Sequence, residues 1–227
     1  MPETTQAKSP ASLEKTESNE MNLAGKNPTD IAKESRAQME RENMRFNRVE
    51  LKPRRQLGEI KDGAALDEYF RKNGIVPNRV FKQFEASATQ KSSLNSNSGD
   101  MQTQSVPTAS NNGWEAGSYV NAVVFNNSEG SIQAGSYSRV YDGIIQYLEV
   151  TGRLFRNGLL GFDVQLASSQ FSSATNSYIT LVYGEWEVSA QDAQRWWTQQ
   201  GQHKFIDYAG GRETWTPNTF ADANRPY

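Results

Sequence analysis

Residues 119–141, YVNAVVFNNSEGSIQAGSYSRVY, decide the fold class. Two runs rich in strand-forming residues, 119–125 and 131–141, flank residues 126–130, which are all of kinds that form turns. Such runs, separated by a short loop that contains glycine, are typical of a β-hairpin. The stretch therefore predicts two antiparallel strands at the start of a β-rich region.

Further strand-like segments follow this hairpin, at residues 144–155, 160–167, 178–188 and 204–208. Apolar and polar residues alternate in 162–166, FDVQL, as in a strand with one buried face. Residues 189–199 resemble a short helix, because Ser189 is a good N-cap and Asp192 follows three residues later. Five or six strands with one short helix in residues 114–227 predict a mainly β fold, an antiparallel β-sandwich or a partly open barrel.

The first half of the chain has a different composition. Residues 1–110 hold 5 aromatic side chains, whereas residues 111–227 hold 19. Polar segments with few apolar residues cannot bury enough surface to offset the entropy of ordering. We therefore predict a disordered tail at 1–32, a basic helical segment at 33–55, a small helical docking unit at 56–86, a flexible linker rich in Ser, Asn and Gln at 87–113, and a β-sandwich domain at 114–227.

The docking unit is predicted from its caps and its apolar face. Asp62 is a plausible N-cap, and Asn73-Gly74 supplies a C-terminal stop. A unit of this size is too small for a core of its own, so it is expected to dock on the β domain or on a partner. Its apolar residues are Leu66, Tyr69, Phe70, Phe81 and Phe84.

The basic segment carries 8 positive and 4 negative residues between positions 33 and 55. One interpretation is a solvated helix on which Glu and Arg pair locally. The alternative is an arm that contacts phosphates or an acidic protein surface. The basic residues of this arm are Arg41, Arg45, Arg48, Lys52, Arg54 and Arg55.

Catalytic and cofactor motifs are absent from the sequence. The chain has no cysteine and one histidine, His203, which lies in a polar stretch and is expected to be exposed. On a strand, Glu185 and Glu187 would point to the same face with their Cα atoms ~6.6–6.8 Å apart. This distance is near the separation of the two carboxylates in glycosidases. Two solvated glutamates are the simpler interpretation, so we predict no catalytic residue, no metal site and no cofactor.

Tryptophans are the candidate interface or ligand residues. On a helix, the neighbours Trp196 and Trp197 would diverge by ~100°, so one of them is expected outside the core. Tryptophan is enriched at binding hot spots, and exposed aromatic rings also suit sugar stacking. The candidates are Trp186, Trp196, Trp197 and Trp215.

This layout favours a non-enzymatic structural or assembly protein, a subunit of a virion-like or machine-like complex whose N-terminal arm docks on neighbouring subunits. The expected partners are other protein subunits, in a homo-oligomer or a multi-protein assembly, with nucleic acid as a further partner of the basic arm. The alternatives are a carbohydrate- or ligand-binding β-sandwich and a nucleic-acid-associated protein. Without a long apolar stretch or a signal segment, we predict no membrane span, cytoplasmic synthesis, and a place in a virion or another large assembly.

Overall fold

The computed structural model describes residues 26–54, 60–83, 113–141, 143–158, 163–207 and 213–225. Most of these residues lie in strands, and three helices accompany them. In chain order the elements are α1 (Pro28–Asn43), β1 (Asn47–Arg48), β2 (Lys52–Pro53), α2 (Gly63–Asn73), β3 (Asn78–Gln83), β4 (Gly113–Val124), β5 (Glu129–Val140), β6 (Ile145–Asn157), β7 (Val164–Ser177), β8 (Ile179–Ser189), α3 (Ala190–Ala193), β9 (Trp197–Asp207), β10 (Glu213–Trp215) and β11 (Asn218–Ala223).

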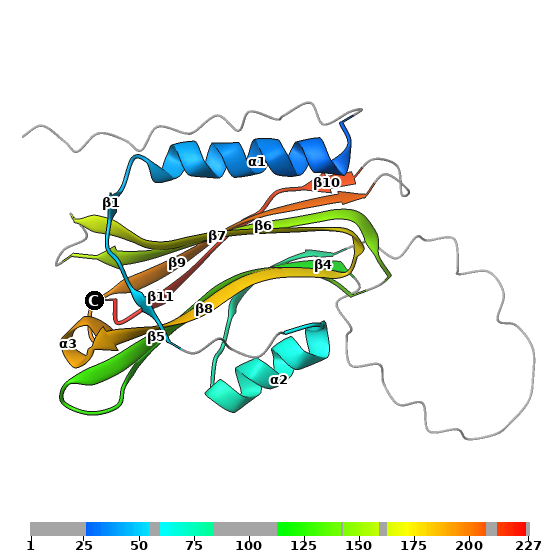
Figure 1. The fold of residues 1–227 in the computed structure, drawn as a ribbon. Coiled ribbons are helices and arrows are strands. Elements are labelled where there is room, and N and C mark those ends of the chain that lie inside the picture. The colour runs from blue at the N-terminus through cyan, green and yellow to red at the C-terminus, as the bar shows by residue number, and fades with distance from the viewer. Residues whose placement is uncertain are drawn as a thin grey trace, which may run out of the picture.

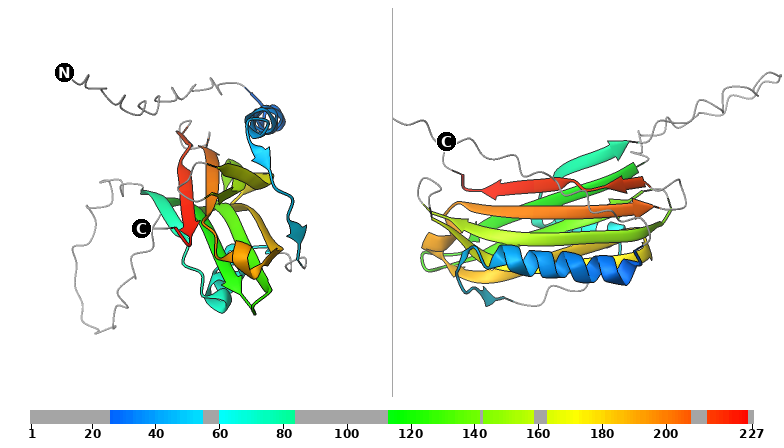
Figure 2. Two further views of the ribbon diagram at one scale, coloured as in Figure 1. Left: turned by 90° about the vertical axis from the view of Figure 1, so that its left-hand side faces the viewer. Right: turned by 90° about the horizontal axis from the view of Figure 1, so that it is seen from above.

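The strands form two facing sheets. Sheet A has the order β1-β7-β6-β9, and both β10 and β11 pair with the far side of β9. Sheet B has the order β2-β8-β5-β4-β3. Every described pairing is antiparallel except that of β1 with β7. Figures 1 and 2 show α1 outside sheet A and α2 outside sheet B. The predicted mainly β, sandwich-like fold is confirmed.

Strand boundaries differ from the predictions in the second half. The hairpin of β4 and β5 forms as expected, in register from Trp114 opposite Val140 to Val124 opposite Gly130. The polar run 168–177, which lies between two of the predicted strands, forms most of β7, because its backbone pairs with β6. The helix expected through residue 199 is one turn, α3, and β9 begins at Trp197. The C-terminal tail, which has no periodicity, forms β10 and β11 against β9.

Two apolar clusters fill the space between the sheets. In the first, the ring of Trp114 stacks on Phe205 with centroids 5.5 Å apart, and Trp215 packs beside them. In the second, Trp186 and Trp197 pack with aliphatic side chains of β5 and β6. The buried members of the two clusters are Trp114, Ala116, Val140, Ile145, Leu148 and Phe205, and Ile132, Ala134, Leu154, Trp186 and Trp197.

Helix α1 begins and ends earlier than the predicted basic helix. Asn27 is its N-cap and accepts a hydrogen bond from the Asp30 N–H, and Pro28 occupies the first turn. The last five residues of the segment predicted as a disordered tail, 28–32, are thus helical. After Asn43 the chain turns, and from Asn47 it is extended across the open side of the sandwich, where β1 pairs with β7 and β2 pairs with β8. We call residues 44–54 the strap.

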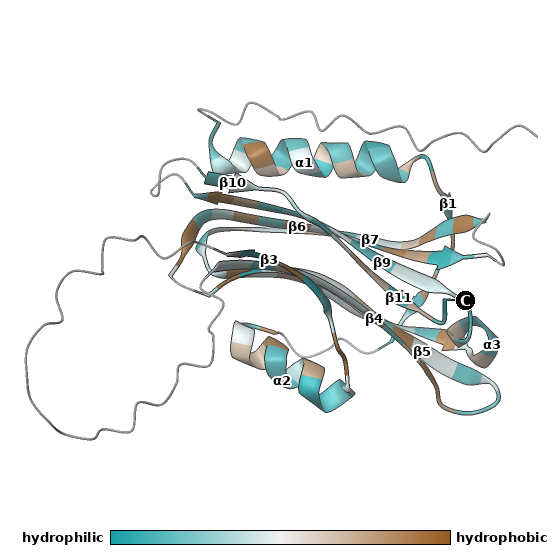
Figure 3. Cartoon of the chain, turned by 180° about the vertical axis from the view of Figure 1, so that it is seen from behind, coloured by the Kyte–Doolittle hydropathy of each residue, from teal (hydrophilic) through white to brown (hydrophobic). Residues whose placement is uncertain are grey.

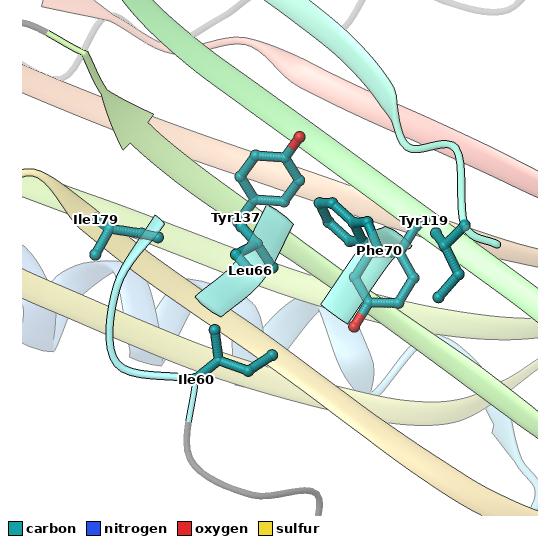
Figure 4. Packing of buried hydrophobic residues seen from close by; sticks show 7 residues of the cluster. Ile60, Leu66, Phe70, Tyr119, Tyr137 and Ile179 are labelled. Atoms are coloured by element: carbon teal, nitrogen blue, oxygen red, sulfur yellow. The ribbon is translucent and has the colours of Figure 1, made fainter. Parts of the chain in front are cut away.

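Helix α2 has the predicted caps. The Asp62 side chain accepts from the Ala65 N–H, and Gly74 adopts the left-handed conformation, φ 62°, that ends the helix. Its apolar face packs on sheet B in a cluster with Tyr119 and Tyr137 (Figure 4). The residues that follow form β3, an edge strand paired with β4, rather than more helix. The docking unit therefore docks on its own β domain; Phe84 and nearly all of the predicted linker lie outside the described residues.

None of the helices in the described part of the chain is long and apolar enough to cross a membrane.

Candidate functional site

A layer of polar side chains crosses the middle of the core, between the two apolar clusters. It is drawn from β4, β5, β9 and β11, and each member is at most 4% exposed. We call this set the polar layer. Its members are Ser118, Ser136, Ser138, Gln199, His203 and Thr219.

Hydrogen-bond directions in the polar layer follow from one fixed end. The Ser138 hydroxyl donates to the carbonyl oxygen of Glu149 at 3.0 Å, so its single proton is committed there. Ser138 must then accept from Nδ1 of His203, 3.0 Å away. A neutral imidazole that donates from Nδ1 accepts at Nε2, and Thr219 Oγ1 lies 2.7 Å from that atom.

The same reasoning continues to the other end of the polar layer. Because Thr219 donates to the imidazole, it must accept from Ser118, whose Oγ lies 2.5 Å away. Ser118 in turn accepts from Ser136 at 2.8 Å, and Ser136 accepts from the Gln199 amide at 3.0 Å. The six side chains therefore form one unidirectional chain that satisfies every hydroxyl and fixes the imidazole as the neutral Nδ1–H tautomer.

Two glycines make room for this chain. A Cβ on Gly201 would overlap the His203 ring and lie 2.6 Å from Ser118 Oγ. A Cβ on Gly152 would lie 2.9 Å from the Gln199 amide nitrogen. Small residues at these inward positions let polar side chains occupy a space that a larger side chain would fill.

His203 differs from its sequence prediction, because it lies on β9 in the core and not in an exposed loop. Burial lowers the pKa of His203 to about 3, since the surroundings offer no compensation for a positive charge. The Ser138 and Thr219 hydroxyls beside it are buried as well. The arrangement resembles a nucleophile and base only in its residue types, because no substrate can reach hydroxyls enclosed by both sheets.

A second polar cluster lies on the outer face of sheet B. Glu115 is fully buried, yet its carboxylate accepts hydrogen bonds from Tyr137 at 2.6 Å and from Tyr141. Arg79 Nε lies 3.2 Å from the same carboxylate and balances its charge. Burial, followed by the nearby Glu115 charge, raises the pKa of Tyr141 to about 12. The cluster is therefore a satisfied ion pair in which both phenols stay protonated.

A hollow of about 320 Å³ opens beside this cluster, at the end of the sandwich where α2 begins. Tyr141 and Tyr178 line it, and both rings are more than one-third exposed. Arg139 also lines it, held by Asp67 at 3.0 Å and lying under the Tyr141 ring. Ile144, 62% exposed, lies in the same loop as Tyr141. We call Tyr141, Ile144 and Tyr178 the end patch.

Polar contacts join α1 to the outer face of sheet A. Arg153, 2% exposed, lies 2.7 Å from the Glu42 carboxylate and donates to Asn43 and Gln202. One helical turn after Ile31, the Ser35 hydroxyl accepts from Lys204. Figure 3 shows α1 hydrophilic along most of its length, with a hydrophobic turn near its N-terminus.

The tryptophans predicted as interface residues lie mostly in the core. Trp197 is fully buried and Trp186 is 8% exposed. Trp215 packs on Phe205 with ring centroids 4.9 Å apart. Trp196 alone of the four stays half-buried without joining a core cluster; its indole donates to Asp222, and Arg225 lies over its ring. A row of exposed tryptophans for sugar stacking is therefore not formed by these residues.

The residues of the predicted basic arm differ in their contacts. Lys52 lies 2.7 Å from Glu187, and Arg54 lies 3.2 Å from Glu185. Lys52 and Arg54 thus engage both glutamates that the sequence offered as a carboxylate pair. Arg55 lies outside the described residues, whereas the remaining three arginines are exposed and form no salt bridge within the described residues. Those three are Arg41, Arg45 and Arg48.

Within the described ranges, no group of three or more His, Asp or Glu side chains is placed to hold a metal ion. The polar layer and the end patch were both missed by the sequence analysis. The available signal in the sequence was the alternation of side chains along β5. Ser136 and Ser138 lie on the face that points into the core, whereas Tyr137 between them lies on the other face. Small polar residues at core-facing positions indicate an internal hydrogen-bonded layer, but the partners come from other strands.

No family model and no curated protein matches this chain. Among solved structures, a protein from Arabidopsis thaliana studied in solution is 13% identical, with a TM-score of 0.28, over 48% of this chain and 78% of that chain. A glycosyl hydrolase family 2 member from Bacteroides cellulosilyticus is 14% identical, with a TM-score of 0.26, over 44% of this chain and 14% of that chain. Likenesses this distant carry no argument about function.

Proposed function

We propose that the chain is a non-enzymatic subunit that associates with further copies of itself in a larger protein assembly. The observation that carries this proposal is the end patch, where Tyr141 and Tyr178, 36% and 40% exposed, line one hollow. Ile144, 62% exposed, follows three residues after Tyr141. Monomeric soluble proteins rarely expose large apolar side chains in such groups. An aromatic and aliphatic cluster beside an arginine is the composition favoured at the centre of protein interfaces.

A second group of exposed apolar side chains supports the proposal from another side of the molecule. Val76 and Val80 are 92% and 41% exposed, and they flank Asn78, whose amide donates to the carbonyl oxygen of Phe220. The Phe220 ring is itself 48% exposed. We call Val76, Val80 and Phe220 the side patch. Two separate apolar surfaces on one subunit allow an assembly to extend beyond a dimer.

Both outer sheet faces carry helices of the same chain, which leaves the ends and sides of the sandwich for contacts (Figure 2). The polar layer supports a structural role, because its groups satisfy one another and are closed to substrates. Nucleic-acid binding is the weaker alternative, since the exposed Arg41, Arg45 and Arg48 belong to a chain with a net charge of −2.

Light scattering coupled to size exclusion tests the proposal on the full-length protein. We expect a defined species larger than the 25.4 kDa chain. Ile144→Ser with Tyr178→Ser removes apolar contact area and should reduce its mass. Met44→Ser is the matched control, because Met44 is 76% exposed but lies outside both patches. A wild-type protein that stays monomeric over a roughly hundredfold range of concentration contradicts the proposal.

A further inference from the structure

β7 forms one side of sheet A, and most of its outer edge has no strand beside it in the described part of the chain. β1 pairs with β7 at Gln165 and Leu166, and the Val49 N–H of the strap donates to the Leu166 carbonyl at 3.1 Å. β6 occupies the other side of β7 along its whole length. Residues 168–177 thus present one strand edge that the described elements leave unpaired.

β7 also lacks the features that protect the other edge strands of this molecule. Natural edge strands discourage further pairing with charged side chains, prolines or very short length. The 14 residues of β7, VQLASSQFSSATNS, include no charged residue and no proline. The remaining edge strands carry such residues: Lys52 and Pro53 in β2, Arg79 and Lys82 in β3, Glu213 in β10 and Asp222 in β11.

We propose that residues 168–177 pair antiparallel with the same residues of a second copy, so that two A sheets join across a two-fold axis. This inference rests on the proposed assembly function and specifies one of its contacts. In a two-fold pairing the strand must be complementary to itself, because each residue faces another residue of the same strand. Like charges opposite each other destabilise a strand pair, so an uncharged strand of small side chains suits self-pairing.

The surroundings of β7 set the limits of this contact. The strap ends the free edge at Leu166, and the bend into β8 at Tyr178 ends it on the other side. Residues 168–177 lie within these limits, and these ten residues make about 33 Å of strand. α1 lies over the outer face of β7, where Arg36 sits 5.0 Å from the centre of the Phe171 ring (Figure 2). Two-fold pairing would therefore bring two α1 helices side by side above the joined sheet.

Variants that add charge at two exposed positions of β7 test the pairing. Ser173 and Thr175 are both exposed, so Ser173→Lys with Thr175→Lys places like charges near the axis without filling the core. We expect the dissociation constant of the dimer to rise roughly tenfold or more, measured by sedimentation. Ser173→Glu with Thr175→Glu should act alike, whereas a mixture of the two variants should restore the dimer. Thr214→Lys with Asn218→Lys, at exposed positions of β10 and β11, is the control and should change nothing.

Hydrogen exchange gives a second readout on the unaltered chain, because amide exchange in residues 168–177 should slow as protein concentration rises. Wild-type assembly that is lost in end-patch variants but unchanged in the lysine variants overturns the β7 inference and leaves the proposed function standing. A monomeric wild-type protein overturns both. Lysine variants that dissociate but are not rescued by mixing with the glutamate variants also contradict two-fold pairing.

Discussion

His203 illustrates how a single residue can be buried in a sandwich without an apolar environment. Both ring nitrogens have partners, and the hydroxyl chain beyond them is directed from the Gln199 amide to the Glu149 carbonyl. An unpaired buried polar group costs about 1–3 kcal/mol, so a complete chain avoids several such penalties. A protonated ring would also donate from Nε2 and would face the Thr219 proton, which requires the hydroxyl chain to reverse.

Stability should therefore fall in mild acid because of His203. The folded state holds the pKa of this imidazole at about 3, whereas an unfolded histidine titrates near 6.5. The unfolded chain alone takes up the proton between these values, so unfolding becomes easier as pH falls from about 6.5. We expect the unfolding free energy, measured by urea denaturation, to decline between pH 7 and 5 with a slope of at most about 1.4 kcal/mol per pH unit.

His203→Gln provides the comparison for this pH dependence. Glutamine keeps one donor and one acceptor but does not titrate, so its stability should be nearly flat from pH 7 to 5. Parallel pH profiles for the wild type and His203→Gln would show that other groups cause the decline.

Trp196 and Trp197 show what could be inferred about single residues from the sequence. The expectation that one would be buried and the other would lie outside the core agrees with the structure. The physical reason for the divergence differs from the predicted one. Neighbours in a strand point to opposite faces, whereas the sequence predicted both residues on a helix. A local pattern can thus indicate that two neighbours diverge, but the partners that bury Trp197, from β5, β6 and β8, are distant in sequence.

At the level of elements, α1 and α2 are held in opposite ways. α2 contributes Leu66 and Phe70 to an apolar cluster with sheet B. α1 contributes Ile31 to a small apolar cluster, and its other contacts with sheet A include the Glu42–Arg153 ion pair, the Ser35 hydroxyl and the Arg36 guanidinium over the Phe171 ring. Buried ion pairs add less to stability than apolar packing of similar size, but their removal on one side leaves an uncompensated charge. α1 should therefore be the more easily detached of the two helices.

Neighbouring residues of α1 allow this to be measured. Glu42→Ala leaves the buried Arg153 without its carboxylate, and we expect a loss of about 2 kcal/mol in unfolding free energy. Arg41→Ala removes an exposed side chain of the same helix and should cost less than about 0.5 kcal/mol. Urea denaturation gives both values, and amide exchange should show α1 opening in the first variant. Equal small losses would mean that the ion pair does not hold the helix.

Sequence signals identified α2 almost to the residue but misplaced the elements whose partners are distant. Asp62 and Gly74 mark its ends through local hydrogen bonds, which a sequence displays directly. The strap has helix-forming residues, and its extended conformation follows from pairing with β7 and β8, more than 100 positions away. The cap of α1, Asn27 followed by Pro28, was also visible in the sequence as a start signal and was overlooked.

At the scale of the whole molecule, elements on both sides of the predicted linker, residues 87–113, belong to one β domain. β3 belongs to sheet B, and α2 covers its outer face, so both are part of the β domain. A chain that begins at residue 56 loses only the tail, α1 and the strap, and we expect it to fold with a lowered melting temperature. A chain that begins at residue 111 exposes Tyr119, Tyr137 and Ile179, and we expect it to aggregate or remain unfolded.

The free energy of burying the apolar residues around α2 explains why the two fragments should differ in stability. Ile60, Leu66, Phe70 and Ile75 are each at most 9% exposed, and burial of one such side chain contributes about 1.5–3 kcal/mol. Their combined contribution, about 6–12 kcal/mol, is comparable with the 5–15 kcal/mol by which typical domains are stable. Circular dichroism and thermal melts of the two fragments check the expectation. A stable, monomeric fragment beginning at residue 111 would contradict it and restore the boundary at the linker.

The register of β3 and β4 has a practical consequence. Gln83 pairs directly with Gly113, so the 29 residues between them join two chain positions that already lie side by side. The fold does not need a connection of that length at this place. New termini, an epitope tag or a fluorescent reporter introduced between these residues would leave both strand partners in register, which makes this interval the natural location for circular permutation or labelling of the protein.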